Sequence, residues 1–209
     1  MSMKYDFTTI LNREGTGAIA VSKIPFDNAE IKEGFSKIPM WVADMNYATA
    51  PSVIEAIQNR LEHPVFGYFD IKDAYSESII EWQKTRNGVT DISKEAIDYE
   101  NGVLGGVSSV LQAFTAPGEA ILLHSPAYIG FIGTITNMGR KIVYSPLKKD
   151  EQGVWRMDYE DMEKKIVEYK IHAAVFCSPY NPVGRVWTRD EIERAMEIFK
   201  RHNVFVVSD

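Results

Sequence analysis

Short apolar runs alternate with segments of helical periodicity in the second half of the chain, and this alternation is the strongest constraint on its fold. Apolar runs typical of strands lie at 120–124, 142–144, 173–177 and 204–208. The segments between them repeat apolar residues every three or four positions, as amphipathic helices do. Strands that alternate with helices of this length form βαβ units, in which helices cover both faces of a parallel sheet. We therefore predict a three-layer α/β protein with a largely parallel sheet flanked by helices.

End signals in the sequence support these helices. Asp158 is a candidate N-cap for a helix over 159–169, and Thr188 followed three residues later by Glu191 forms a capping-box pattern before another helix. The first 40 residues, in contrast, are punctuated by glycine and proline and show no clear period. We expect an N-terminal arm at residues 1–46 and an α/β domain at residues 47–209. Further helices are expected at 53–61, 71–82, 107–114 and 128–138.

Composition and charge exclude several classes of protein. The 209 residues are 45% hydrophobic and 25% charged, which is ordinary for a globular protein and unlike collagen-like or disordered chains. Twenty-three basic against 29 acidic residues give a net charge of −6, without a basic stripe that would suit a nucleic acid. The one cysteine, Cys177, has no neighbour at metal-ligand spacing. With no apolar run of the roughly 20 residues that a membrane helix needs, we expect a cytoplasmic protein without a metal site.

Three polar or aromatic side chains follow the predicted strands at their carboxyl ends, where open α/β sheets bind ligands. Tyr128, Asn181 and Asp209 would converge on one edge of the sheet. A ring, a carboxamide and a carboxylate together can hold a flat, polar heteroaromatic ring. Each also has a purely structural interpretation: Tyr128 as a cap on the core, Asn181 as part of an Asn-Pro turn, and Asp209 as a helix N-cap.

A glycine-rich segment, residues 101–106, runs into the helix predicted at 107–114. Glycines let the backbone approach a ligand closely, and the free amides at a helix N-terminus favour an anion such as phosphate. Because glycine-rich turns before helices are common, this segment alone is a weak indication of a binding site.

Six segments stand in a fixed order along the chain: Pro39-Met40-Trp41-Val42-Ala43-Asp44-Met45, Phe66-Gly67-Tyr68, Asn101-Gly102-Val103-Leu104, Pro126-Ala127-Tyr128, Asn181-Pro182-Val183-Gly184 and Val206-Val207-Ser208-Asp209. Together they resemble the fold-type I pyridoxal-phosphate (PLP) enzymes of the class I/II aminotransferase superfamily. The Asn-Pro-x-Gly segment marks the superfamily, and the segment around Trp41 resembles the MalY/PatB group of cystathionine β-lyases, or C–S lyases. The pattern runs over nearly the whole chain but matches only the N-terminal half of such an enzyme.

The resemblance implies a role for each matched residue of the domain. Asp209 would face the pyridine nitrogen of PLP, where a carboxylate favours the protonated ring. Asn181 would donate to the phenolic oxygen of the ring, and Tyr128 would stack on its face. The backbone amides of Val103 and Leu104 would hold the phosphate.

The resemblance also assigns residues of the N-terminal part. Trp41, Val42 and Ala43 would line the substrate side, which makes residues 1–46 both arm and substrate-side segment. Tyr68 would reach across the interface of a homodimer to the phosphate of the neighbouring subunit. The partners implied are a small amino-acid substrate and a second copy of the chain.

The implied activity is PLP-dependent C–S β-lysis, which gives pyruvate, ammonia and a thiol from an L-cysteine thioether such as cystathionine. No lysine of this chain stands in the context of the family's Schiff-base lysine, so no catalytic residue is assigned. We therefore expect a truncated enzyme, incomplete at the C-terminal end of its domain, which binds PLP weakly and is inactive by itself. Two alternatives stay open: an aminotransferase of an amino acid and a 2-oxo acid, and a non-catalytic regulatory or binding protein on the same scaffold.

Overall fold

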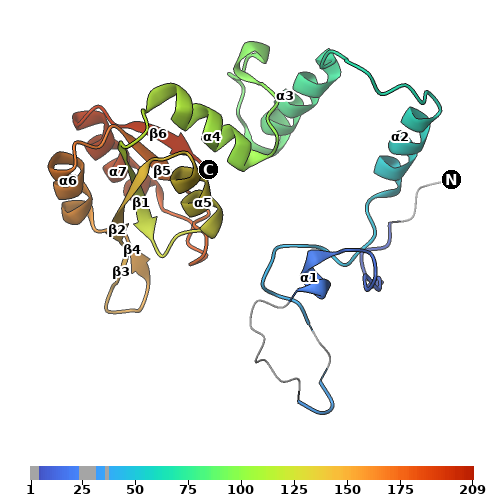
Figure 1. Cartoon of the computed structure of the whole chain (residues 1–209), viewed down its shortest axis with the longest axis horizontal. Coiled ribbons are helices and arrows are strands. Elements are labelled where there is room, and N and C mark those ends of the chain that lie inside the picture. The colour runs from blue at the N-terminus through green and yellow to red at the C-terminus, as the bar shows by residue number, and fades with distance from the viewer. Residues whose placement is uncertain (1–4, 24–31, 36–37) are drawn as a thin grey trace. The chain divides into compact units, whose positions relative to one another are not determined.

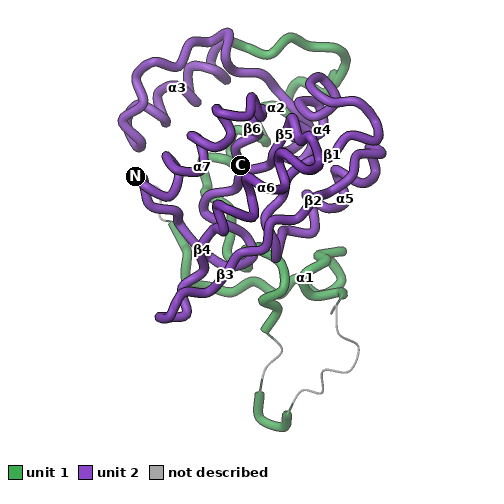
Figure 2. Tube along the Cα trace, turned by 90° about the vertical axis from the view of Figure 1, so that its left-hand side faces the viewer, with its two compact units in different colours: residues 1–72 green, residues 73–209 purple. Residues whose placement is uncertain are grey.

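A computed structural model describes residues 5–23, 32–35 and 38–209 (Figure 1). The chain divides into two compact units, residues 1–72 and residues 73–209 (Figure 2), and each is described here by itself. The boundary that we expect after residue 46 stays a prediction. Within the described ranges, no helix combines the length and the apolar character that a membrane crossing requires.

The described residues of the first unit include two helices. The short α1 spans Ile19–Ser22, in a part of the arm for which no helix was predicted. The longer α2 spans Pro51–Leu61, with proline in the first turn, where its missing N–H costs nothing. This helix confirms the one predicted from the apolar spacing at 53–61.

Two segments of the arm are tied together although more than 30 residues separate them. The amide of Leu11 donates to the carbonyl of Asn46 at 2.8 Å. Arg13 Nη2 lies 2.7 Å from Asp44 Oδ2, and Arg13 Nη1 donates to the carbonyl of Met45 at 3.2 Å. These contacts hold residues 44–46 against the start of the arm.

The second unit contains the alternating elements that the sequence predicts, together with a 3₁₀ helix and two two-residue strands that it does not predict. Their order along the chain is shown in Figure 1. They are α3 (Asp73–Asn87), the 3₁₀ helix η1 (Lys94–Ala96), α4 (Val103–Phe114), β1 (Ala120–Ser125), α5 (Ile129–Asn137), β2 (Lys141–Pro146), β3 (Lys148–Lys149), β4 (Trp155–Arg156), α6 (Tyr159–Glu168), β5 (Ala173–Phe176), α7 (Arg189–Arg201) and β6 (Phe205–Ser208).

The main sheet has four parallel strands in the order β2-β1-β5-β6. β1 pairs with β5 through Leu123 opposite Val175, and β5 pairs with β6 through Phe176 opposite Ser208. Helix α4 contacts α5, and α6 contacts α7; Figure 1 shows the strands lying between α5 and the pair α6–α7. Right-handed crossovers account for this placement of the helices. The predicted fold class, an α/β protein with a parallel sheet flanked by helices, is confirmed.

Two predicted helix starts are confirmed in atomic detail. Asp158 Oδ1 accepts from the amide of Asp161 at 3.2 Å, so it caps α6. At α7, Thr188 Oγ1 accepts from the amide of Glu191 at 3.3 Å, and Glu191 Oε2 accepts from the amide of Thr188 at 2.8 Å. The capping box therefore satisfies two otherwise unpaired amides.

The core lies around the two central strands. All four residues of β5 and the middle four of β1 are buried, as expected of parallel strands covered on both faces. The strands at the sides of the sheet, β2 and β6, are partly exposed. Side chains that are less than 2% exposed include Leu111, Ile121, Leu122, Leu123, Ile135, Met162 and Ala195.

The polar residue His124 lies within this core, at the end of β1. Its ring is 2% exposed, and Nδ1 lies 3.3 Å from the carbonyl oxygen of Ser145. Nε2 has no hydrogen-bond partner among the described residues. Burial lowers the pKa of His124 to about 4, so the ring is neutral at pH 7.

We predict that His124 makes the protein sensitive to mild acid. Above its ordinary pKa of 6.5 the ring is neutral in both the folded and the unfolded state, and the full stability is present. Between pH 6.5 and about 4 only the unfolded state binds the proton, so up to about 3 kcal/mol of unfolding free energy is lost as the pH falls. Urea unfolding of the wild type and of His124→Asn at a series of pH values measures this loss.

The control for that measurement is His172→Asn, because His172 is exposed. We expect His124→Asn to flatten the fall in stability between pH 6.5 and 4, and the control to keep it. The same pH dependence in His124→Asn and the wild type would contradict the assignment.

Candidate functional site

A pocket of about 490 Å³ brings together every site residue that the sequence predicts in the second unit. It lies where the strands β1, β5 and β6 end and where α4 begins. This is the edge at which open parallel sheets bind ligands. Its lining residues are Asn101, Gly102, Val103, Leu104, Tyr128, Phe131, Asn181 and Asp209.

The first turn of α4 forms one wall of the pocket. Gly102 is its N-cap and has φ = 78°, a left-handed conformation that suits glycine. No side chain caps this end of the helix. The amides of the first turn, those of Val103 and Leu104 among them, have no partner within the helix and point outward from its positive end. This wall can therefore bind an anionic group.

The ring of Tyr128 forms a second wall, and a glycine makes room for it. Tyr128 is the N-cap residue of α5, and its ring lies edge-to-face with that of Phe131 at 5.4 Å between centroids. A Cβ atom on Gly130 would lie 2.3 Å from Tyr128 Cε1 and 2.8 Å from Leu104 Cδ1. Tyr128 can hold this position only because residue 130 has no side chain.

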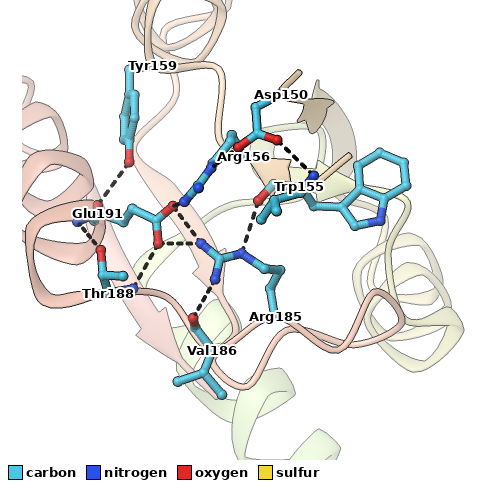
Figure 3. A network of polar contacts seen from close by, with 9 residues as sticks. Asp150, Trp155, Arg156, Tyr159, Arg185, Val186, Thr188 and Glu191 are labelled. Carbon is cyan, nitrogen blue, oxygen red and sulfur yellow. Dashed lines mark hydrogen bonds and ion pairs between the residues drawn. The ribbon is translucent and has the colours of Figure 1, made fainter. Parts of the chain in front are cut away.

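The loop that carries Asn181 is anchored where it leaves the site. Arg185 Nη2 donates to both carboxylate oxygens of Glu191, at 2.7 and 2.6 Å, and Arg185 Nε donates to the carbonyl of Trp155 at 3.0 Å. Arg156 reaches the same carboxylate at 2.8 Å (Figure 3). Partial burial opposes ionisation of Glu191, but the amide of Thr188 and the two guanidinium groups outweigh it and lower the pKa of that carboxyl. These bonds fix the end of the Asn181 loop to α7 and to the β3–β4 hairpin.

Asp209 is held by both its backbone and its side chain. Its amide donates to the carbonyl of Phe176, and its carbonyl accepts from the amide of Ser178, both at 2.9 Å. The thiol of Cys177 donates to Asp209 Oδ2 at 3.2 Å. Burial, together with the nearby carboxylate, raises the pKa of Cys177 to about 11, so the thiol keeps its proton and stays a donor.

The remaining sequence-predicted residues belong to the first unit. Trp41 is tied to the arm, because its indole Nε1 donates to the carbonyl of Ala20 at 3.3 Å. Val42 is half-buried, and Ala43 and Tyr68 are exposed. The substrate-side role of residues 41–43 and the role of Tyr68 in a dimer stay predictions.

One lining residue was not predicted from the sequence. Phe131 is 2% exposed and lies on the apolar face of α5. Its spacing is that of an ordinary core residue, and only its packing against Tyr128 connects it with the pocket. Nothing in the sequence separates it from its apolar neighbours.

The fold and the pocket define an α/β domain in which an aromatic ring, a carboxamide and a carboxylate lie around a helix N-terminus that can accept an anion. Residues 36–209 match the model of the family "Aminotransferase class I and II". The chain therefore belongs to this family.

Individual members of the family are similar to this chain over most of its length. The chain is 34% identical over 172 residues to the cystathionine beta-lyase PatB of Bacillus subtilis strain 168, covering 82% of this chain and 44% of that protein. It is 33% identical over 208 residues to the protein MalY of Escherichia coli K12, covering 98% and 51%. The crystal structure of cystalysin from Treponema denticola, which contains pyridoxal 5'-phosphate, matches with a TM-score of 0.87 at 32% identity, covering 99% and 52%. The chain spans about half the length of these relatives.

We predict opposite effects for two glycine-to-alanine substitutions in α5. Gly130→Ala forces the ring of Tyr128 to move, because the new Cβ overlaps it, and should cost about 1–3 kcal/mol of unfolding free energy. At Gly133 nothing lies within 4 Å of the new Cβ, so Gly133→Ala should stabilise the helix by about 0.5–1 kcal/mol. Urea unfolding of both variants measures the difference, and equal stabilities would contradict the contact of Tyr128 with Gly130.

Proposed function

We propose that this chain carries the cofactor-binding part of a PLP-dependent C–S β-lyase that acts on an L-cysteine thioether such as cystathionine. The observation that supports this best is the pocket in which Tyr128, Asn181 and Asp209 face the start of α4. Similarity to the cystathionine beta-lyase PatB supports the choice of reaction, and similarity to cystalysin, whose structure contains pyridoxal 5'-phosphate, supports the choice of cofactor.

The residues present suit PLP in charge and in shape. The uncapped first turn of α4 offers amide donors at the positive end of a helix, which is the preferred environment of a phosphate. A pocket of about 490 Å³ lies within the range of sites for small ligands and cofactors. The exposed ring of Tyr128 offers a face on which a flat ring can stack.

Each residue then has a definite task. Val103 and Leu104 bind the phosphate through their backbone amides. Tyr128 stacks on the ring and excludes water from that face, and Asn181 donates to the phenolic oxygen. Asp209 holds a proton at the pyridine nitrogen, and the thiol of Cys177 orients the carboxylate.

When bound, PLP supplies an acceptor for the electrons released at the substrate's Cα, as β-elimination requires. Asp209 strengthens this effect because its negative charge keeps the ring nitrogen protonated. Overall, a cystathionine-like thioether and water give a thiol, pyruvate and ammonia. An aminotransferase would use the same pocket residues. The two activities are therefore distinguished by the product that is released.

The charge of Asp209 provides the first test. We expect Asp209→Asn to weaken the binding of PLP to this chain roughly tenfold, since a hydrogen bond to a charged group is worth about 1.5–3 kcal/mol. Quenching of tryptophan fluorescence during a PLP titration measures the affinity. Asp91→Asn, which removes an exposed carboxylate that does not line the pocket, is the control. Equal affinities of Asp209→Asn and the wild type would contradict the role of Asp209.

The reaction itself is tested on the protein as its gene encodes it. With cystathionine as substrate, we expect pyruvate and free thiol in equal amounts, because elimination releases one of each per turnover. Coupling pyruvate to lactate dehydrogenase and thiol to a chromogenic disulfide measures both. Transfer of the amino group to a 2-oxo acid without release of pyruvate would overturn the lyase and favour the aminotransferase.

A further inference from the structure

Tyr180, which does not line the pocket, connects the two loops that carry Tyr128 and Asn181. Its side chain is 2% exposed, in the loop that follows β5. Its hydroxyl lies 2.7 Å from the carbonyl oxygen of His124 and 2.9 Å from that of Pro126. The two carbonyl oxygens share the one proton that the hydroxyl donates. His124 is the last residue but one of β1, and Pro126 begins the loop that leads from β1 to Tyr128.

The hydroxyl lies where strand pairing stops. The pairing of β1 with β5 ends at Leu123 opposite Val175, one residue before His124. Beyond this point β1 stays paired only with β2 to its end, and the loops that follow β1 and β5 each contribute one residue to the pocket. The Tyr180 hydroxyl therefore continues the connection between the strands at the point where their own hydrogen bonds end.

Tyr180 is itself held rigidly in its loop. Its amide donates to the carbonyl of Arg185 at 2.6 Å, and its carbonyl accepts from the amide of Gly184 at 2.8 Å. Its ring packs against that of Trp187 at 5.6 Å between centroids. Burial raises the pKa of the Tyr180 phenol, so the hydroxyl keeps its proton and stays a donor.

We propose that Tyr180 is a positioning residue, whose hydroxyl sets the separation of Tyr128 and Asn181 by bridging the carbonyls of His124 and Pro126. The part of this inference that concerns ligand affinity rests on the proposed binding of PLP. Tyr128 would stack on the ring face and Asn181 would contact the ring edge, so a change in their separation alters the fit of a flat ring. The bridge itself is a property of the protein alone and can be measured without a ligand.

The test is Tyr180→Phe, which removes the hydroxyl and keeps the ring. Hydrogen–deuterium exchange measures local opening of the backbone. We expect the amides of Gly184 and Phe131 to exchange roughly tenfold faster, the effect of losing one buried hydrogen bond on local opening. The middle of β1 and the helix α6 should keep their protection. PLP, measured by fluorescence quenching, should bind roughly fivefold more weakly, since ordering the two loops then opposes binding.

Tyr159→Phe is the matched control. Its hydroxyl donates to the carbonyl of Glu191 at 3.3 Å, and Tyr159 does not line the pocket. This variant should leave exchange in the loops of Tyr128 and Asn181, and the affinity for PLP, unchanged. If Tyr180 served only the core, Tyr180→Phe would raise exchange evenly across β1, β5 and β6, and that result would overturn the proposal.

A second measurement does not depend on the folding of the variant. In the wild type, PLP should slow exchange in both loops with the same dependence on its concentration, and protection of one loop alone would overturn the coupling. Faster exchange of both loops in Tyr180→Phe, with no PLP binding by the wild type, would support the bridge and contradict the proposed cofactor. If exchange in both loops is the same in Tyr180→Phe as in the wild type, and the wild type binds PLP, the positioning role of Tyr180 is overturned and the proposed cofactor is still supported.

Discussion

The parallel pairing of β1 with β5 at the centre of the sheet determines where the candidate site lies. Both strands are buried, their side chains form the core, and their backbone groups pair with each other and with the outer strands β2 and β6. Because the strands are parallel, the loops that leave them start at the same edge. The polar residues that follow the strands therefore meet at that edge, although they lie far apart in the sequence.

Many of the helices and strands of the second unit can be predicted from local sequence patterns. The cap at Asp158 and the capping box at Thr188 and Glu191 act within one turn of helix, so three or four residues suffice to recognise them. The buried strands are continuous apolar runs bounded by turns. The convergence of Tyr128, Asn181 and Asp209 followed from a topological rule, and all three line the same pocket.

The features that were not predicted depend on contacts between distant residues. The β3–β4 hairpin has two-residue strands, Lys148–Lys149 and Trp155–Arg156, which are too short to show a period. It is stabilised instead by Arg156, which bonds Asp150 within the hairpin and Glu191 on α7. The bridge made by Tyr180 joins residues 54 and 56 positions apart, so no local pattern contains it.

At the carboxyl edge of the sheet, hydrogen bonds join neighbouring strand ends, as a preorganised binding site requires. The backbone of Asp209 joins the ends of β5 and β6, as the hydroxyl of Tyr180 joins the ends of β1 and β5. Loop residues ordered before a ligand arrives lose less conformational entropy on binding, and more of the contact energy is then available as affinity. The bonds at this edge therefore hold exposed loop residues such as Asn181 in place before a ligand binds, as the proposed contact with a flat ring requires.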